Sequence, residues 1–208
     1  MDITNPPINN YLYRVTPPRD GILQEMEALA KKHNFPIIGP LVGRFLFQMA
    51  TITKAQKIFE LGSGYGYSAY WFASAMGKKG KIICTDGDEK NKILAESFFK
   101  RAKISNKITF KVGNALEILA ATKGTFDIIL NDVDKHQYPE VFDLVIPKLK
   151  KGGVFITDNL LWSSKVLDPH PDASTLGILK FTHKIYSSKK VFSTILPIRD
   201  GISVSVKL

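Results

Sequence analysis

The sequence has few of the features that mark secreted, membrane-spanning or fibrous proteins. Among its 208 residues Cys84 is the only cysteine, so no disulfide can form within the chain. No apolar run reaches the roughly 18 residues that a membrane span needs. No basic and then apolar leader follows Met1, so we expect no signal peptide. The 15 glycines and 11 prolines have no period, which excludes a collagen-like chain. These absences predict a cytoplasmic protein.

Acidic residues are also scarce relative to basic ones. The chain has 29 lysines and arginines against 19 aspartates and glutamates, a formal net charge of +10. Such a charge suits either a nucleic-acid partner or a solvated, lysine-rich surface. We favour the surface, because the lysines are spread along the chain and form no long block of like charge. The length and an apolar share of 44% predict one globular domain over residues 1–208.

The order of the expected elements indicates the fold. Residues 1–19 are polar, carry four prolines, and are expected to form an extended N-terminal arm outside the core. Helices are expected at residues 21–33 and 39–50. Beyond them we expect strands at 57–61, 81–85, 108–112, 126–131, 154–157, 191–196 and 202–206, and helices at 68–76, 89–102, 115–121, 138–149 and 173–186. Gly152 and Gly153 would end the helix over 138–149.

This alternation of strands and helices predicts an α/β fold with an open, mostly parallel sheet. The last two strands are joined by a turn at residues 199–201 that is too short for a crossover helix, so one of them must run antiparallel to its neighbour. The expected sheet therefore has seven strands, one of them antiparallel. Ligands of such sheets bind at the carboxyl ends of the strands, where the motifs below lie.

A glycine-rich loop follows the first strand. Gly62, Gly64 and Gly66 allow a sharp turn and a close approach of a ligand to the backbone. The dinucleotide-binding pattern G-x-G-x-x-G would need its third glycine where Tyr67 stands. The acidic Glu60 at the strand end would repel a pyrophosphate and suit a cationic amino-acid group. The loop therefore favours a nucleoside cofactor without phosphates.

Two further strand ends could complete a cofactor site. Asp86 and Gly87 follow the second strand, where an acidic residue commonly binds ribose hydroxyls. Asn114 and Ala115 follow the third strand and are placed to flank a base ring. Asn114 could also cap the helix that begins at Ala115, and the two roles are compatible.

The fourth and fifth strands end in side chains that carry oxygen. Asp132 follows one strand, and Asp158 and Asn159 follow the other. Adjacent parallel strands lie about 4.8 Å apart, so the three side chains can converge into an all-oxygen set that suits Mg²⁺. Helix caps or turns would explain each residue singly, but not two acidic strand ends beside a glycine loop. Lys135 could accept a proton from a metal-bound hydroxyl, or pair with Asp134 as a surface lysine.

These motifs resemble those of known methyltransferases. The segment Glu60–Ser68 resembles the cofactor loop of class I S-adenosylmethionine-dependent methyltransferases, whose fold is Rossmann-like. The patterns D-x-D-K at 132–135 and D-N-x-L-W at 158–162 resemble the cation-dependent O-methyltransferases, which include catechol and caffeoyl-CoA O-methyltransferases. The likeness extends from residue 17 to Leu208 and includes Pro36–Gly43 and Asp200-Gly201. Asn131 departs from the family, which often has an apolar residue there.

The resemblance implies a role for each motif. It assigns S-adenosylmethionine to Ile38, Glu60, Gly62, Ser63, Gly64, Tyr65, Gly66, Ser68, Asp86, Gly87, Asn114, Ala115 and Asp132. It assigns Mg²⁺, or another divalent cation such as Mn²⁺ or Ca²⁺, to Asp132, Asp158 and Asn159, and the role of base to Lys135. It also implies a homodimer.

The methyl acceptor is open between two classes. The first is a small phenolic molecule with neighbouring hydroxyls, whose pocket Trp162 would line unless it is a core tryptophan. The second is a 5-hydroxyuridine of tRNA, which some bacterial relatives methylate. The basic clusters at 148–151 (Lys148, Lys150, Lys151) and Lys189-Lys190 favour the second, because phosphate contact needs clustered basic residues. A third interpretation, a protein that binds S-adenosylmethionine without catalysis, is disfavoured by the intact metal and base residues.

Overall fold

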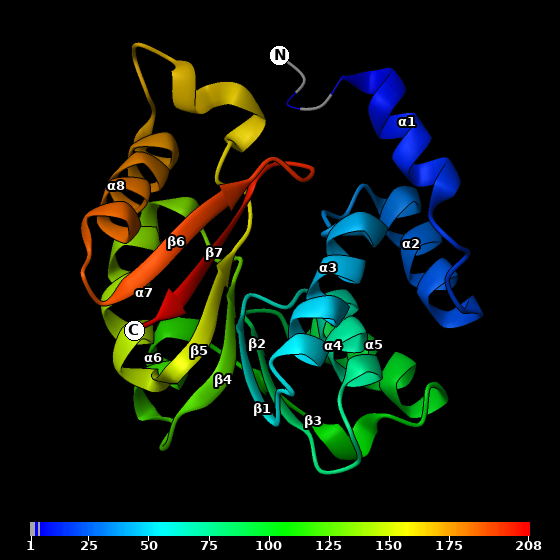
Figure 1. Cartoon of the computed structure of the whole chain (residues 1–208). Coiled ribbons are helices and arrows are strands. Elements are labelled where there is room, and N and C mark those ends of the chain that lie inside the picture. The colour runs from blue at the N-terminus through cyan, green and yellow to red at the C-terminus, as the bar shows by residue number, and fades with distance from the viewer. Residues whose placement is uncertain (1–2, 4) are drawn as a thin grey trace.

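The computed structural model describes residue 3 and residues 5–208, and a seven-stranded sheet lies at its centre (Figure 1). The strands are β1 (Lys57–Leu61), β2 (Lys81–Asp86), β3 (Ile108–Val112), β4 (Phe126–Asn131), β5 (Leu149–Thr157), β6 (Val191–Leu196) and β7 (Ile202–Lys207). Their order across the sheet is β3-β2-β1-β4-β5-β7-β6. The pairs among β1 to β5 are parallel, whereas β7 runs antiparallel to both β5 and β6. The structure confirms the predicted fold class.

Helices cover both faces of the sheet (Figure 1). They are α1 (Pro6–Val15), α2 (Gly21–His33), α3 (Gly39–Ile52), α4 (Tyr67–Ala75), α5 (Glu89–Arg101), α6 (Ala115–Ala121), α7 (Tyr138–Lys148) and α8 (Ala173–Ser187), with the short 3-10 helices η1 (Ser105–Lys107), η2 (Lys135–Gln137) and η3 (Trp162–Leu167). One core contains side chains of α2 to α5, and a second contains those of α6 to α8. Neighbouring residues of β1 serve opposite cores, Ile58 the first and Phe59 the second. This burial on both faces explains the almost continuous apolar run of the strand. Among the described residues, no helix has the length and hydrophobicity to cross a membrane.

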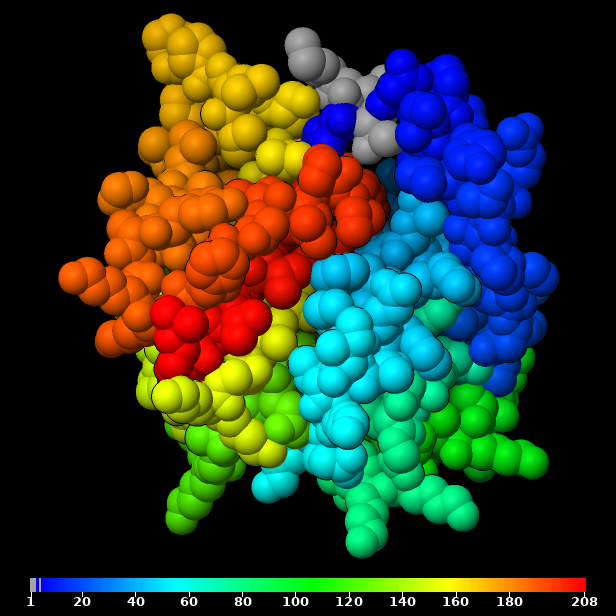
Figure 2. Space-filling view, viewed as in Figure 1, coloured from blue at the N-terminus to red at the C-terminus, as the bar shows by residue number. Residues whose placement is uncertain are grey.

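The N-terminal arm differs from its prediction. We expected an extended segment, but residues 6–15 form the helix α1. Pro6 and Pro7 occupy its first turn, where a missing N–H costs nothing because no helical carbonyl precedes it. None of its residues is buried, and it lies on the outside of the molecule (Figure 2), so its place outside the core was predicted correctly. Residues 1, 2 and 4 of the predicted arm lie outside the described residues.

The helix stop predicted at Gly152 and Gly153 is wrong. Helix α7 ends at Lys148, and β5 begins at the next residue, Leu149. Both glycines lie inside β5, where the pairing with β4 shifts its register. Gly152 has φ of +72°, a conformation that glycine adopts without a steric penalty. The glycine pair therefore accommodates an irregularity in the strand.

Part of the positive charge has a structural role within the chain. Lys107 Nζ donates to the carbonyl oxygens of Ala73 and Met76, both at 2.7 Å, at the end of α4. Lys148 and Lys207 make the same kind of paired bonds at the ends of α6 and α7. Carboxyl-terminal helix ends carry unsatisfied carbonyls and a partial negative charge, which a lysine stabilises. These three lysines therefore need no external partner to explain them.

Candidate active site

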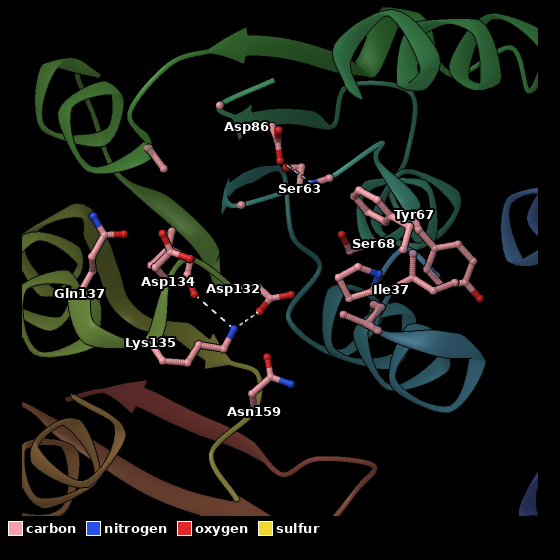
Figure 3. A pocket seen from close by; sticks show the side chains of 18 of the residues that line it. Ile37, Ser63, Tyr67, Ser68, Asp86, Asp132, Asp134, Lys135, Gln137 and Asn159 are labelled. Carbon is pink, nitrogen blue, oxygen red and sulfur yellow. Dashed lines mark hydrogen bonds and ion pairs between the residues drawn. The ribbon is translucent and has the colours of Figure 1, made fainter. Parts of the chain in front are cut away.

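A cavity of about 820 Å³ opens at the carboxyl ends of the parallel strands. Its wall contains residues from the segments 35–38, 62–68, 86–87, 113–115 and 132–137, together with Asn159, Trp162, Ser174 and Arg199. Figure 3 shows side chains of these segments around one shared space. Of the predicted site residues, all except Glu60, Gly66 and Asp158 are among the described residues of the wall. Motifs that lie far apart in the sequence are thus brought together.

The glycine loop passes close to the end of β4. Gly62 has φ of +80°, and a Cβ atom there would lie 2.5 Å from the backbone oxygen of Asp132. A Cβ atom on Gly66, whose φ is +85°, would overlap the ring of Phe99. Gly62 therefore permits the close approach that a cavity wall needs. Gly66 packs against Phe99 behind the wall, and its predicted contact with a cofactor stays a prediction.

Glu60 also lies behind the wall, and its predicted contact with a cofactor stays a prediction. The residue is 0% exposed, because it lies in β1 beneath the loop, and Ser68 stands between it and the cavity. Its carboxylate accepts hydrogen bonds from Ser68 Oγ and from Cys84 Sγ. Burial raises the pKa of Glu60 to about 7. The hydrogen bond from Ser68 therefore links Glu60 to a residue of the cavity wall.

Replacing Glu60 by glutamine is expected to change how stability depends on pH. Below the ordinary pKa of 4.5 the carboxyl is neutral in both the folded and the unfolded chain. Between 4.5 and about 7 only the unfolded chain ionises, so the folded wild type loses stability as pH rises, and the full loss remains above pH 7. Glu60→Gln removes this loss. Urea unfolding at several pH values checks it, and parallel curves for the two proteins would contradict the assignment.

Two predicted cofactor residues also organise the loops that carry them. Asp86 Oδ2 accepts a hydrogen bond from the backbone N–H of Gly64 at 3.0 Å, and Oδ1 accepts one from Asn91 Nδ2 at 2.9 Å. Asn114 Oδ1 accepts from the backbone N–H of Leu116 at 2.9 Å, so it caps α6, and it also lines the cavity. The predicted helix cap at Asn114 is therefore present, and the capping side chain still lines the cavity.

Sequence reasoning did not predict that Tyr65 and Tyr67 attach the loop to α2. Tyr65 Oη donates to the backbone oxygen of Met26 at 2.9 Å, and Tyr67 Oη donates to Glu27 Oε1 at 2.6 Å. Tyr67 lines the cavity, whereas Glu27 also pairs with Arg19. The available signal was Tyr67, which stands where the dinucleotide-binding pattern has its third glycine. We interpreted this residue only as evidence against a dinucleotide.

Two carboxylates and two basic side chains meet at the ends of β4 and β5. Lys135 Nζ lies 2.7 Å from Asp132 Oδ1, and Arg199 Nη1 lies 3.1 Å from Asp158 Oδ2. Burial raises the pKa of Asp158, and the negative charge of Asp132 is the second largest cause of the increase. Burial likewise raises the pKa of Asp132, against the opposing charge of Lys135. The two carboxylates are thus costly to keep ionised, and a further cation would relieve that cost.

Lys135 faces the cavity rather than the surface. Its side chain is 12% exposed and bonds to Asp132, so the alternative pairing with Asp134 is not formed. Its Nζ also lies 5.4 Å from the ring centre of Tyr138 and 5.6 Å from that of Trp162. Figure 3 shows the amine pointing toward Asp132, with Asn159 on its other side. A basic nitrogen is therefore held beside the oxygen-bearing side chains.

The residues of this cluster fit a hard divalent cation. Asp132, Asp158 and Asn159 offer two carboxylates and an amide oxygen, the ligand types that Mg²⁺ prefers. Asp158 Oδ1 is buried and has no hydrogen-bond partner among the described residues. The Asn159 amide donates through Nδ2 to Asp200 Oδ2 at 3.1 Å, which leaves its oxygen available. The described residues contain no group of three or more histidine, cysteine and acidic side chains, so a zinc-type site is not present among them.

A tightly wound turn places Trp162 at the cavity. Trp162, Ser163 and Ser164 all have left-handed backbones, with φ of +47°, +50° and +68°. Asp200 Oδ1 accepts a hydrogen bond from the backbone N–H of Ser163. The backbone oxygen of Asp200 accepts one from the backbone N–H of Leu161 at 2.9 Å. Such conformations persist only where the surroundings impose them. Trp162 is partly buried: it lines the cavity and also packs against the second core.

The basic clusters lie away from the cavity. Lys148 ends α7, Lys150 and Lys151 lie at the start of β5, and Lys189 and Lys190 precede β6. Because β5 and β6 both run antiparallel to β7, they point the same way, and their starts lie at the edge opposite the cavity. Lys150 also pairs with Asp127 at 2.5 Å. These clusters therefore do not lie beside the cavity.

Fold and site together define a class of enzyme. The mostly parallel sheet has its single antiparallel strand at β7. A glycine loop follows β1, an acidic residue ends β2, and the cavity opens beside both. This arrangement is that of the class I methyltransferase fold.

Comparisons with known proteins agree with this class. The family model described as O-methyltransferase matches residues 17–208. Catechol O-methyltransferase of Niastella koreensis is 29% identical over 198 residues, which cover 90% of each chain. Caffeoyl-CoA O-methyltransferase 1 of Arabidopsis thaliana is 30% identical, over 91% of this chain and 79% of the plant protein. The crystal structure of an O-methyltransferase from Bacillus cereus in complex with SAH has a TM-score of 0.88 and 28% identity, with 97% of each chain covered. The chain belongs to the O-methyltransferase family and is an S-adenosylmethionine-dependent O-methyltransferase.

Proposed function

We propose that the protein transfers the methyl group of S-adenosylmethionine to a hydroxyl of a small catechol-like acceptor, with a divalent cation at Asp132, Asp158 and Asn159. One observation carries the proposal: Asp132, Asn159 and Lys135 line the same cavity as the glycine loop, and the buried Asp158 pairs with Arg199 of that wall. The catechol and caffeoyl-CoA O-methyltransferases among the relatives support the acceptor class.

The upper part of the cavity in Figure 3 is the proposed cofactor site. Ser68, held by Glu60, and the glycine loop would bind the methionine part, and Asp86 would bind the ribose. Asn114 and Ala115 would flank the adenine, and Ile38 would contact the cofactor from the start of α3. The SAH bound in the Bacillus cereus relative supports S-adenosylmethionine as the cofactor. The chemistry that S-adenosylmethionine supplies is a methyl group already activated by its sulfonium.

The residues at the other end would prepare the acceptor. The chemistry that a divalent cation supplies there is chelation of two neighbouring acceptor oxygens and a lower pKa for one of them. Lys135 would take the proton of that hydroxyl at Nζ. Asp132 and the rings of Tyr138 and Trp162 fix Nζ in place. Trp162 lines the acceptor side of the wall. Holding the nucleophilic oxygen in line with the methyl group supplies much of the rate.

Transfer of labelled methyl from S-adenosylmethionine tests the proposal. We expect label in caffeate with Mg²⁺, loss of at least about 100-fold of that transfer in excess chelator, and recovery when Mg²⁺ returns. A second arm offers tRNA that lacks the wobble methyl group. Label in the tRNA alone would contradict the phenolic acceptor, and chelator-resistant label in caffeate would contradict the cation.

A further inference from the structure

Arg199 is a charged residue of the cavity wall that the proposed mechanism does not use. We propose that Arg199 competes with a divalent cation for Asp158. Its guanidinium pairs with Asp158 while the site lacks a cation, and a divalent cation binds by displacing it. Arg199 thereby lowers the affinity of the site for the cation. The inference rests on the cation site of the proposed function.

The pairing of Arg199 with Asp158 is the first observation. Nη1 lies 3.1 Å from Oδ2 of a carboxylate whose side chain is 2% exposed, whereas the arginine side chain is 33% exposed. The guanidinium therefore reaches a buried acid from the cavity side. The other oxygen of Asp158 has no hydrogen-bond partner among the described residues. Arg199 is thus the side chain that satisfies this acid in the structure.

The backbone of Arg199 is fixed, so only its side chain is free to move. Its φ is +52°, a left-handed conformation that costs energy in a residue other than glycine. The turn is closed by the bond from Gly201 N–H to the Ile198 oxygen at 2.9 Å, and Leu161 N–H binds the Asp200 oxygen at 2.9 Å. Figure 2 shows the segment between β6 and β7 at the surface, where a displaced guanidinium would meet solvent.

A divalent cation and this guanidinium compete for one carboxylate. Both are positive, and Asp158 is buried where water screens their repulsion poorly. A cation on Asp158 therefore weakens the arginine pair, and the pair in turn weakens the cation. Lys135 opposes the cation in the same way, but the proposed mechanism needs its amine. Arg199 has no such step to perform, so its effect on the cation is its distinguishing contribution.

Binding of Mn²⁺, followed by the electron paramagnetic resonance signal of the free ion, tests the inference without catalysis. Arg199→Gln is expected to bind Mn²⁺ about 10-fold more tightly than the wild type, because the competing charge is gone. Arg199→Lys keeps the positive charge but loses the planar guanidinium that matches a carboxylate. It should therefore raise the Mn²⁺ affinity less than Arg199→Gln does. Arg44→Gln removes one exposed charge from α3, away from the cavity wall, and is the matched control with unchanged affinity.

Thermal unfolding supplies a second readout. In chelator, Arg199→Gln should unfold at a lower temperature than the wild type, because Asp158 loses its partner, and Mg²⁺ should stabilise the variant by the larger amount. If Arg199→Gln does not fold, Arg199→Lys carries the test. Equal or weaker Mn²⁺ binding by the variants, with normal binding by the wild type, overturns the inference alone. Absence of Mn²⁺ binding in every protein overturns the cation site of the proposed function as well.

Discussion

Asp158→Asn is expected to lose about 1000-fold or more of the methyl transfer to caffeate, because it removes one of the two negative charges that would hold the cation. Asparagine has nearly the shape of aspartate, so the buried position is still filled. The turnover at saturating S-adenosylmethionine, measured over a series of Mg²⁺ concentrations, checks the result. We expect the affinity for the cofactor, measured by calorimetry, to change much less than the turnover.

The matched control for this variant is Asp143→Asn. Asp143 pairs with Lys184 at 2.6 Å on the surface, and its side chain is 66% exposed. The control therefore removes an equal charge from an ion pair outside the cavity, and it should keep wild-type turnover. Wild-type turnover in Asp158→Asn at low Mg²⁺ would contradict the cation site.

Replacing Lys135 is expected to have the second large effect. Lys135→Met removes the proposed base, and general-base catalysis contributes about 100- to 10,000-fold, so the turnover number should fall by that amount. Lys135→Arg distinguishes a base from a mere positive charge. An arginine keeps the charge beside Asp132 but does not give up its proton, so it should fail nearly as completely.

A nearby lysine controls for the loss of positive charge. Lys165 Nζ lies 5.5 Å from the ring centre of Trp162 on a side chain that we assign no chemical step. Lys165→Met should retain turnover within a few-fold of the wild type. The base assignment would be refuted by a Lys135→Arg enzyme as active as the wild type, since charge alone would then suffice.

The sheet was predictable because its strands are buried on both faces. β1, β3, β4 and β6 have the predicted bounds, since a short apolar run between turn residues has few other solutions. The brief turn before β7 predicted that one of the last two strands runs antiparallel to its neighbour, and the structure shows that this strand is β7. Helix α1 was not predictable in this way. Its prolines signal a break in most contexts, yet they are tolerated in a first turn, and no buried face marks the helix.

The cavity was predictable in its backbone and less so in its side chains. The glycine loop and the acidic strand ends lie where parallel topology requires them. The motif does not say which way a strand residue points, and Glu60 therefore proved to be buried beneath Ser68 rather than exposed in the wall. The location of the lysine clusters depends on strand direction in three dimensions. Arg199 entered the site through a turn 41 residues after Asp158, a pairing that only the fold establishes.

A crystal structure with S-adenosylhomocysteine and Mn²⁺, recorded with anomalous scattering, is the decisive test of the cation site. We expect one Mn²⁺ peak in contact with oxygens of Asp132, Asp158 and Asn159, with the nucleoside along the glycine loop and its ribose at Asp86. A cation bound elsewhere, with these three side chains still paired to Lys135, Arg199 and Asp200, would contradict it.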